Sequence, residues 1–247
     1  MHMKELTWVI PNYLVDQGLL HYVEQAILSL KVTNLEAILL LIDCGSPIGG
    51  GYLREHADIY VRFRENPGFV LAANTGLRLA KTPYIGLMNN DIRLSPNAFE
   101  VARSIFFADD RVYSVHPRMI DYNEPFSYGD KDYYEGRERW CQSSCFFVRN
   151  TDTLILFPEH FVGTGGGYED WYYHATVRKL GWKTVYTERA CFQHAHSVTS
   201  RLLGEESKKL APNSELFRRE FGLLPEEYYI KLYPEQMARD WKKGFEL

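Results

Sequence analysis

The 247-residue sequence lacks the features that mark two large classes of protein. No run of Lys and Arg is longer than two residues and the net charge is −4, so a basic surface for nucleic acid is missing. No apolar run approaches the roughly 20 residues of a membrane span, and no charged-then-apolar leader is present. We therefore expect no nucleic-acid partner, no transmembrane segment and a cytoplasmic location, with peripheral attachment to a membrane left open.

Several motifs that carry common chemistries are also missing. The sequence contains neither the Walker-type phosphate loop, GxxxxGK followed by Ser or Thr, nor a GxGxxG loop. It also has no GxSxG motif of the kind that presents a nucleophilic serine. The cysteine spacing matches no paired CxxC zinc pattern, which favours reduced, buried thiols. The four cysteines are Cys44, Cys141, Cys145 and Cys191.

What the sequence does contain is an alternation of continuous apolar runs and helix-like segments. Hydrophobic residues make up 45% and charged residues 24%, an ordinary composition for one large globular domain. This alternating order predicts an α/β fold with a mostly parallel sheet and helices on both faces. Strands are predicted at 6–13, 35–46, 57–66 and 82–91, with helices at 18–32 and 67–81 between them.

The second half of the chain predicts further elements. A Ser-Pro pair predicts a helix over 95–110, with Ser95 as N-cap and Pro96 at the first helical position. Residues 121–139 are polar and predict a loop or a short hairpin. Strands are predicted at 111–120, 140–150 and 183–197, a helix within 163–183 that ends at Gly181, and helical stretches near 204–221 and 234–243.

Polar residues follow several of the predicted strands at their carboxyl ends. Ligands of such sheets bind beyond these ends, so Pro11, Asn12, Asp43 and the triplet 89–91 are expected to converge in one crevice. Asp43 can accept hydrogen bonds from a base or a ribose hydroxyl. It can equally form an Asx turn that fixes the loop at Gly45.

The Asn-Asn-Asp triplet and a Gly-containing helix start are candidate phosphate ligands. Asp91 can hold Mg²⁺ or Mn²⁺ together with water and substrate phosphates, or it can cap the following helix. Asn89 and Asn90 can bind phosphate or ribose, or make turn hydrogen bonds. Gly68 and Gly76 flank a helix start whose N–H groups suit a diphosphate, although an ordinary loop-to-helix joint looks the same in sequence.

Two acidic residues and two histidines complete the set of candidates. Glu169 and Asp170 follow the glycines 165–167, which predict a mobile loop that orders on substrate binding. Either carboxylate can be a general base, or both can complement a helix dipole. His194 and His196 lie two residues apart on a strand, so only one faces the crevice unless the chain turns there. An imidazole beside a carboxylate is a competent Mn²⁺ ligand, but a half-buried histidine needs no metal.

The order of these motifs resembles a family 2-type glycosyltransferase with the GT-A fold. The donor half of that family is matched by WVIPNYL (8–14), LLIDCGS (40–46), NPGFVLAANTGL (66–77) and LMNNDI (87–92). Its second half is matched by CQSSCFFVRN (141–150), GGGYEDWYYHATVRKLGWK (165–183), CFQHAHSVTS (191–200) and NSELFRREFG (213–222).

The resemblance implies a Rossmann-like, mostly parallel central sheet with flanking helices and a C-terminal helical tail. The glycosyltransferase domain would span 3–200, with a nucleotide-sugar donor half at 3–92 and an acceptor half at 93–200. A helical C-terminal extension would cover 201–247. No acceptor motif is recognised in 121–140 or in 157–168.

The resemblance also implies roles for individual residues. Asp170 would be the catalytic base, Asp91 and His194 would bind the metal, and Glu169 and Trp171 would contact the acceptor. The triplet lacks the first acid of a DXD-type motif, so its Mn²⁺ or Mg²⁺ would rely more on water and on the donor's phosphates. Donor-binding residues would be Pro11, Asn12, Asp43, Asn66, Gly68, Asn74, Asn89 and Asn90.

The resemblance thus implies an inverting glycosyltransferase that uses a nucleotide-diphosphate sugar, with UDP expected first and a hexosyl or deoxyhexosyl group transferred. The acceptor would be a glycan or a glycolipid, as in polysaccharide biosynthesis. A nucleotidyltransferase would need a basic loop after the first strand, and PNYLVDQG (11–18) offers no basic residue. A non-catalytic nucleotide- or sugar-binding module would need no Glu-Asp helix.

Overall fold

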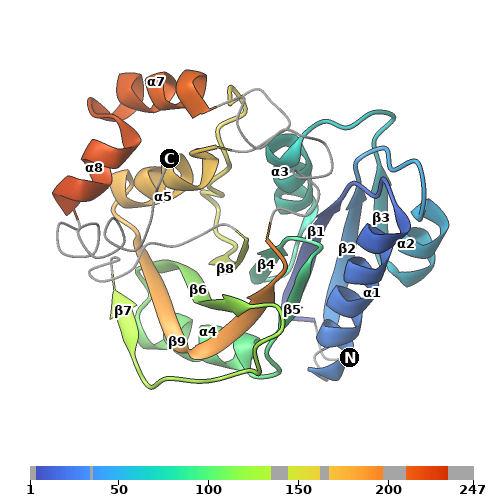
Figure 1. Cartoon of the computed structure of the whole chain (residues 1–247). Helices are drawn as coiled ribbons and strands as arrows, with labels where there is room; N and C mark the ends of the chain where they lie inside the picture. Colours follow the sequence, from blue (N-terminus) through green and yellow to red (C-terminus); the bar gives the residue numbers. More distant parts are fainter. Residues whose placement is uncertain (1–3, 34–35, 135–143, 162–166, 197–209, 233–247) are drawn as a thin grey trace.

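The computed structural model describes residues 4–33, 36–134, 144–161, 167–196 and 210–232. Within these ranges the chain forms one nine-stranded mixed sheet with helices packed against it (Figure 1). The predicted α/β class is therefore confirmed. No helix in the described ranges is both long and apolar enough to cross a membrane.

The first half builds a parallel layer in the strand order β3-β2-β1-β4. The four strands and two helices predicted here are confirmed. A seven-residue helix, α2, was not predicted because its two glycines and short length give no apolar period. The elements are β1 (Leu6–Asn12), α1 (Gln17–Val32), β2 (Ala37–Asp43), α2 (Gly50–His56), β3 (Ile59–Arg62), α3 (Phe69–Leu79) and β4 (Tyr84–Met88).

The second half extends the sheet in the order β8-β6-β9-β5, and β7 pairs with β9. Strands β6 and β9 run parallel to β4, whereas β8, β5 and β7 are antiparallel to their neighbours. The elements are β5 (Ile92–Leu94), α4 (Ala98–Ala108), β6 (Val112–Asp121), β7 (Asp132–Tyr134), β8 (Cys145–Arg149), α5 (Glu169–Lys179), β9 (Lys183–His194), α7 (Leu210–Phe221) and α8 (Pro225–Leu232).

The start of α4 corrects a predicted cap. The N-cap is Asn97, not Ser95, and Pro96 lies in the turn before the helix. Ser95 is fully buried, where its hydroxyl contacts Asn97 Oδ1 at 2.9 Å and accepts the N–H of Cys191 at 3.1 Å. The serine therefore ties the turn to β9, a long-range use of its hydroxyl that the local Ser-Pro pattern does not reveal.

Short elements with distant partners were also missed. β5 and β7 have three residues each, and both pair with β9, about 100 and 55 positions further along the chain. Helix α8 was not predicted, and the helix predicted near 204–221 is seen from residue 210 as α7. The helix predicted at 234–243 lies outside the described residues. Of the cysteines, Cys44, Cys145 and Cys191 are buried free thiols, and Cys141 lies outside the described residues.

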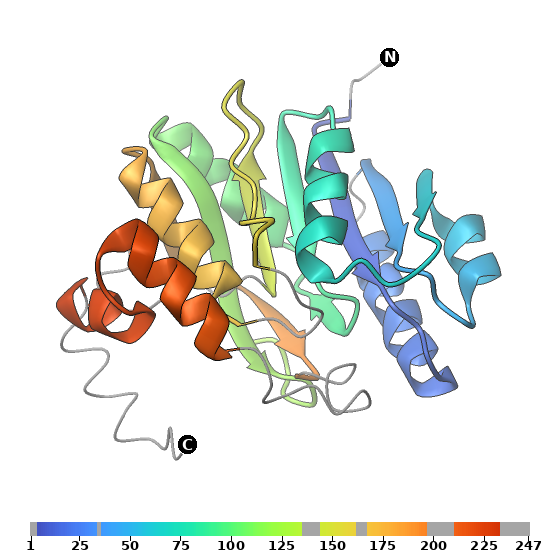
Figure 2. The ribbon, with the colours of Figure 1, turned by 90° about the horizontal axis from the view of Figure 1, so that it is seen from above.

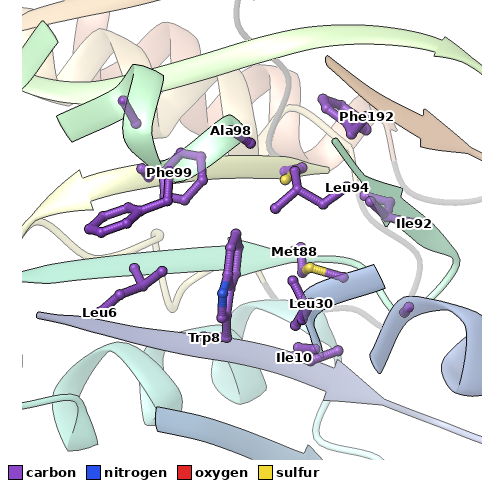
Figure 3. Close-up of a cluster of buried hydrophobic side chains, with 14 of the residues drawn as sticks. Leu6, Trp8, Ile10, Leu30, Met88, Ile92, Leu94, Ala98, Phe99 and Phe192 are labelled. Atoms are coloured by element: carbon purple, nitrogen blue, oxygen red, sulfur yellow. The ribbon is translucent and has the colours of Figure 1, made fainter. Parts of the chain in front are cut away.

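The core fills both faces of the sheet because side chains alternate along each strand. On β1, Trp8 and Ile10 enter the cluster shown in Figure 3, whereas Val9 points to the opposite face. Helices α1 and α4 cover the Trp8 face, and α3 and α5 cover the Val9 face, so helices lie on both sides of the strands (Figure 2). This two-sided burial fixes the strand ends that carry the site.

We expect Gly86→Ala to destabilise the protein because the core around Gly86 has no room for a methyl group. Gly86 pairs with Trp8 across β4 and β1, and an added Cβ would lie 2.4 Å from the buried indole ring. Overpacking of this kind costs about 1–3 kcal/mol of unfolding free energy. Urea unfolding measures the loss. Gly51→Ala, in a helix with open space around the new Cβ, is the control and should stabilise by up to about 1 kcal/mol.

Candidate active site

The predicted site residues gather at one edge of the sheet. Strands β1, β2, β4, β6 and β9 are parallel, so their carboxyl ends share that edge. Helices α3 and α5 each precede a parallel strand and pack on the sheet, so their first turns lie at the same edge. The edge therefore collects Asn12, Asp43, Gly68, the triplet 89–91, Glu169 with Asp170, and His194.

Asp91 and His194 lie face to face at the ends of β4 and β9. Nε2 of the imidazole is 3.2 Å from Oδ1 of the carboxylate, and both residues are buried. Within the described residues, neither ring nitrogen of His194 makes a hydrogen bond. The backbone C=O of Asp91 accepts the N–H of Ala195 at 3.2 Å, which fastens the triplet to the end of β9. Asp91 does not cap a helix, because β5 follows it directly.

The chain turns after β9 and brings the two histidines to the same side. The strand ends at His194, and His196 has a left-handed φ of 56°. Their ring centroids are 4.7 Å apart, and Nε2 of His196 lies 3.7 Å from Oδ1 of Asp121. The alternation expected for a continuous strand is therefore broken here, as the sequence left open.

Asp43 is fully buried and its two carboxylate oxygens have separate partners. Oδ1 accepts the N–H of Ser46, three residues on, at 2.8 Å, so the carboxylate does hold the loop at Gly45, although not by a bond two residues on as in an Asx turn. Oδ2 accepts the Tyr60 hydroxyl at 2.6 Å and pairs with the Arg62 guanidinium. Burial and the bond to Asp43 raise the pKa of Tyr60. Contact between Asp43 and a nucleotide base stays a prediction, and Tyr60 and Arg62 are neighbours that sequence analysis missed.

Asn12 carries a buried acceptor that no donor among the described residues reaches. The residue is 1% exposed, and its Nδ2 donates to the C=O of Ile10 at 2.6 Å. Within the described residues, Oδ1 of Asn12 has no hydrogen-bond partner. A buried polar atom of this kind usually has a partner in the working protein. Pro11 is half-buried beside it, opposite Ile42.

The predicted ribose and diphosphate residues have different surroundings. Oδ1 of Asn66 accepts the N–H of Gly68 at 2.9 Å, and Gly68 starts α3 with a φ of 79°, a conformation that glycine tolerates. Asn74 is fully buried, and its amide clamps both backbone groups of Phe157 at 2.9 and 3.0 Å. Donor contact by Asn74 would require those bonds to open. Gly76 serves packing, because an added Cβ would lie 2.1 Å from the side chain of Val9.

Arg93, two residues after Asp91 in the sequence, is a cation that the motifs did not indicate. The Arg93 guanidinium lies 4.3 Å from the centroid of the Tyr122 ring and donates to the Tyr122 C=O at 2.6 Å. In the described part of the chain, Nε of Arg93 and the hydroxyl of Tyr122 are buried without hydrogen-bond partners. The only feature of the sequence that could have indicated a role for Arg93 was its position, two residues after Asp91. Of the predicted asparagines before Asp91, Asn90 is buried, and Asn89 donates its backbone N–H to the C=O of Ser144 at 2.8 Å.

The predicted base lies in the first turn of α5. Oδ1 of Asp170 accepts the N–H of Trp171 at 2.9 Å, and Oε2 of Glu169 accepts the N–H of Gly167. Burial raises the pKa of Glu169, while its backbone hydrogen bonds oppose the rise. Both acids also complement the helix dipole, so neither interpretation is excluded. Gly165 and Gly166 lie outside the described residues.

Residues 7–165 match the family model described as glycosyl transferase family 2. The chain belongs to this family. The family and the fold predicted from motif order are therefore confirmed, and the protein is a glycosyltransferase. No curated protein sequence matches the chain.

Solved structures with the same fold include TarS of S. aureus. The TarS 1-349 structure has a TM-score of 0.59 and 12% identity, covering 97% of this chain and 78% of that one. A longer TarS structure has a TM-score of 0.61 and 14% identity, covering 91% of this chain and 45% of that one. TarS 1-349 in complex with UDP-GlcNAc has a TM-score of 0.57 and 12% identity, with 97% and 79% covered. At these identities the likeness shows the GT-A fold alone.

The Asp91–His194 pair of this glycosyltransferase fits a divalent cation. The two facing atoms are 3.2 Å apart, and neighbouring ligands about 2.1 Å from an octahedral ion are about 3 Å apart. In the described part of the chain neither imidazole nitrogen of His194 is used in a hydrogen bond, so a lone pair is available for a metal. Within the described residues, however, no group of three or more His, Cys, Asp or Glu side chains gathers around one point. The rest of the ion's shell would come from phosphates and water, and metal binding stays a prediction.

His174, a buried residue of α5, is expected to make the stability of the domain depend on pH. His174 packs against the His116 ring with centroids 4.6 Å apart. Neither of its nitrogens has a hydrogen-bond partner within the described residues. Burial first, and then the charges of His116 and Arg178, hold the pKa of His174 well below its ordinary 6.5.

We expect His174→Phe to remove part of the acid sensitivity of folding. The unfolded chain protonates this histidine below pH 6.5 and the folded chain does not, so stability falls as pH drops through that value. Between pH 7.5 and 5.5 this one group costs about 1.4 kcal/mol. Urea unfolding at both pH values measures the difference in wild type and variant. An equal loss of stability in wild type and variant would contradict the prediction. It would show that His174 takes up a proton equally in the folded and unfolded chain, so that folding does not lower its pKa.

Proposed function

We propose that the protein is an inverting glycosyltransferase that moves a sugar from a nucleotide-diphosphate donor to a hydroxyl of a glycan or glycoconjugate. The observation that carries the proposal is the buried Asp91–His194 pair, 3.2 Å apart, at the sheet edge that also holds Asn12, Asp43 and the first turn of α5. UDP is the proposed nucleotide, because TarS was crystallised in complex with UDP and with UDP-GlcNAc.

In the proposed reaction, Asp170 accepts the proton of the acceptor hydroxyl. The acceptor oxygen bonds to the anomeric carbon as the bond from that carbon to the diphosphate breaks, and attack from the opposite face inverts the configuration. Asp91 and His194 would hold a divalent cation, which supplies positive charge for the leaving diphosphate. The N–H groups at the Gly68 end of α3 add partial positive charge at the same edge.

The donor pocket would use the buried polar atoms described above. Oδ1 of Asn12 can accept a hydrogen bond from a base N–H or a ribose hydroxyl. Arg93 can contribute its guanidinium near Asp91, where the missing first acid of the triplet lowers the negative charge available for a metal. A cation there offsets charge on a diphosphate without help from a metal.

A thermal-shift experiment tests the donor class. UDP, GDP, dTDP and CDP are each added with and without Mn²⁺, and a ligand that binds only the folded state raises the melting temperature. At 100 times its Kd a nucleotide stabilises by about 2.7 kcal/mol, so the shift is readily measured. We expect UDP to give the largest shift and Mn²⁺ to increase it. No shift with any nucleotide at millimolar concentration would contradict the proposal and favour a binding module for another ligand.

A further inference from the structure

The C-terminal helices contact the backbone on both sides of the Glu169–Asp170 pair. Nδ2 of Asn213, in α7, donates to the C=O of Gly167 at 2.8 Å. The Tyr168 hydroxyl donates to Glu226 in α8, and the Tyr229 hydroxyl donates to the C=O of Trp171 at 3.0 Å. The residues immediately before and after the acid pair are therefore tied to one helical pair.

The first turn of α5 needs such support because its own cap is weak. Tyr168 occupies the N-cap position with a φ of 64°, which is uncommon for a residue with a side chain. It makes no side-chain cap bond to the turn. A conformation of this kind persists where surrounding contacts hold it, and here the hydroxyl of Tyr168 is held by Glu226.

A continuous chain of bonds reaches one of the carboxylates. Asn213 is buried and holds the C=O of Gly167, and the N–H of the same glycine donates to Oε2 of Glu169. Asn213 in α7 therefore holds the peptide group after Gly167, and the peptide group before it donates to Glu169. Burial at this point also raises the pKa of Glu169.

An aromatic cluster packs α5 against α7 and α8. The Trp171 and Tyr229 rings are 4.7 Å apart, and Tyr172 contacts Phe221 at 5.1 Å. Ala175, Phe217 and Tyr229 form the buried centre of this contact between α5, α7 and α8. Figure 1 shows the two C-terminal helices beside α5. At the far end of α5, Lys179 pairs with Glu220 at 2.6 Å on the exposed surface.

We propose that α7 and α8 position the catalytic carboxylates, with Asn213 and Glu226 as positioning residues that act through Gly167 and Tyr168. The inference rests on the proposed function, in which Asp170 is the base. Proton transfer depends on near-attack geometry, and a displacement of about 1 Å can cost a factor of about 100 in rate. The C-terminal helices are thus part of the active-site architecture.

The test uses the full chain and three variants of the Tyr168–Glu226 contact. Glu226→Ala removes the acceptor, Tyr168→Phe removes only the hydroxyl, and Glu226→Gln keeps an oxygen that can accept the bond. Glu220→Ala is the matched control, because it removes an exposed carboxylate from α7 at the other end of α5. Each protein is assayed for UDP affinity by titration, and for UDP release from UDP-GlcNAc and other UDP-sugars as a function of pH.

We expect Glu226→Ala and Tyr168→Phe to lower kcat at least about tenfold, with UDP affinity within twofold of wild type. Glu226→Gln should restore most of the rate, and Glu220→Ala should match wild type. A Glu226→Ala enzyme with wild-type kcat, or a Glu226→Gln enzyme as slow as Glu226→Ala, would overturn the positioning role. A wild-type protein that releases UDP from no donor would instead overturn the proposed function.

Amide hydrogen exchange gives a readout that does not depend on the donor. Glu226→Ala should speed exchange in residues 167–173, because these amides lose the contact that holds the first turn. Glu220→Ala should leave the same amides at the wild-type rate. Equal exchange in wild type and Glu226→Ala would overturn the inference even in an active enzyme.

Discussion

Replacing Asp170 with Asn is expected to slow sugar transfer by a factor of about 10²–10⁴ while nucleotide binding is retained. The amide has the shape of the carboxylate but cannot accept a proton from the acceptor hydroxyl. Its oxygen can still accept the N–H of Trp171, so the first turn of α5 should keep its structure. Initial rates of transfer or of UDP release, together with a UDP titration, separate the two effects.

A matched control comes from the opposite edge of the sheet. Asp110 is an exposed aspartate just before β6, at the end of that strand away from the site. Asp110→Asn changes the net charge as Asp170→Asn does and should leave the rate unchanged. If Asp170→Asn kept near wild-type transfer, the base would have to be another group, and Glu169, with a pKa raised by burial, would be tested next.

The sequence pattern was sufficient to predict the helices and strands whose own residues are buried in a regular way. The run that forms β2 is continuously apolar because both of its faces are covered, and this signal needs no knowledge of its neighbours. The strand β7 has only half-buried or exposed residues and exists through its pairing with β9. A residue pattern cannot show such pairing. The same limit explains Ser95, whose hydroxyl serves β9 and not the adjacent helix.

The position of the site could be predicted because ligands of parallel sheets bind beyond the carboxyl ends of the strands. Parallel order predicted that Asp91 lies at this edge, and the family resemblance added His194. The structure sets the two side chains 3.2 Å apart. What the rule could not show is how each side chain is held. Arg62 reaches Asp43 from the neighbouring strand, and Asn74 turns inward to hold Phe157, 83 positions along the chain. These partners are chosen by packing between elements, which leaves no periodic trace in the sequence.

The support of α5 shows the same limit at longer range. Glu226 and Asn213 reach Tyr168 and Gly167 from 58 and 46 positions away. In the sequence, the C-terminal helices are only a charged tail with apolar residues at helical spacing. Their contacts on either side of the acid pair form only when α7 and α8 pack on α5, so no pattern in the sequence reveals them.

Replacing Asp91 with Asn is expected to abolish the effect of Mn²⁺ and to slow transfer by a factor of about 10² or more. A metal's charge on a leaving group is worth several kcal/mol, and each 1.36 kcal/mol is a tenfold change in rate. His194→Ala should weaken the Mn²⁺ effect, because only the carboxylate ligand then remains. The measurements are the Mn²⁺-dependent part of the UDP thermal shift and the rate before and after chelation with EDTA.

Asp121→Asn is the control for this prediction, because it removes a nearby exposed carboxylate that faces His196 and not His194. It should leave both the Mn²⁺ increment and the rate within about twofold of wild type. If Asp91→Asn also kept the wild-type Mn²⁺ increment, the ion would bind elsewhere. If wild type kept its full rate in EDTA, the reaction would need no metal at this pair. Arg93, two residues after Asp91, would then be the proposed positive charge for the leaving diphosphate, since its Nε has no hydrogen-bond partner among the described residues.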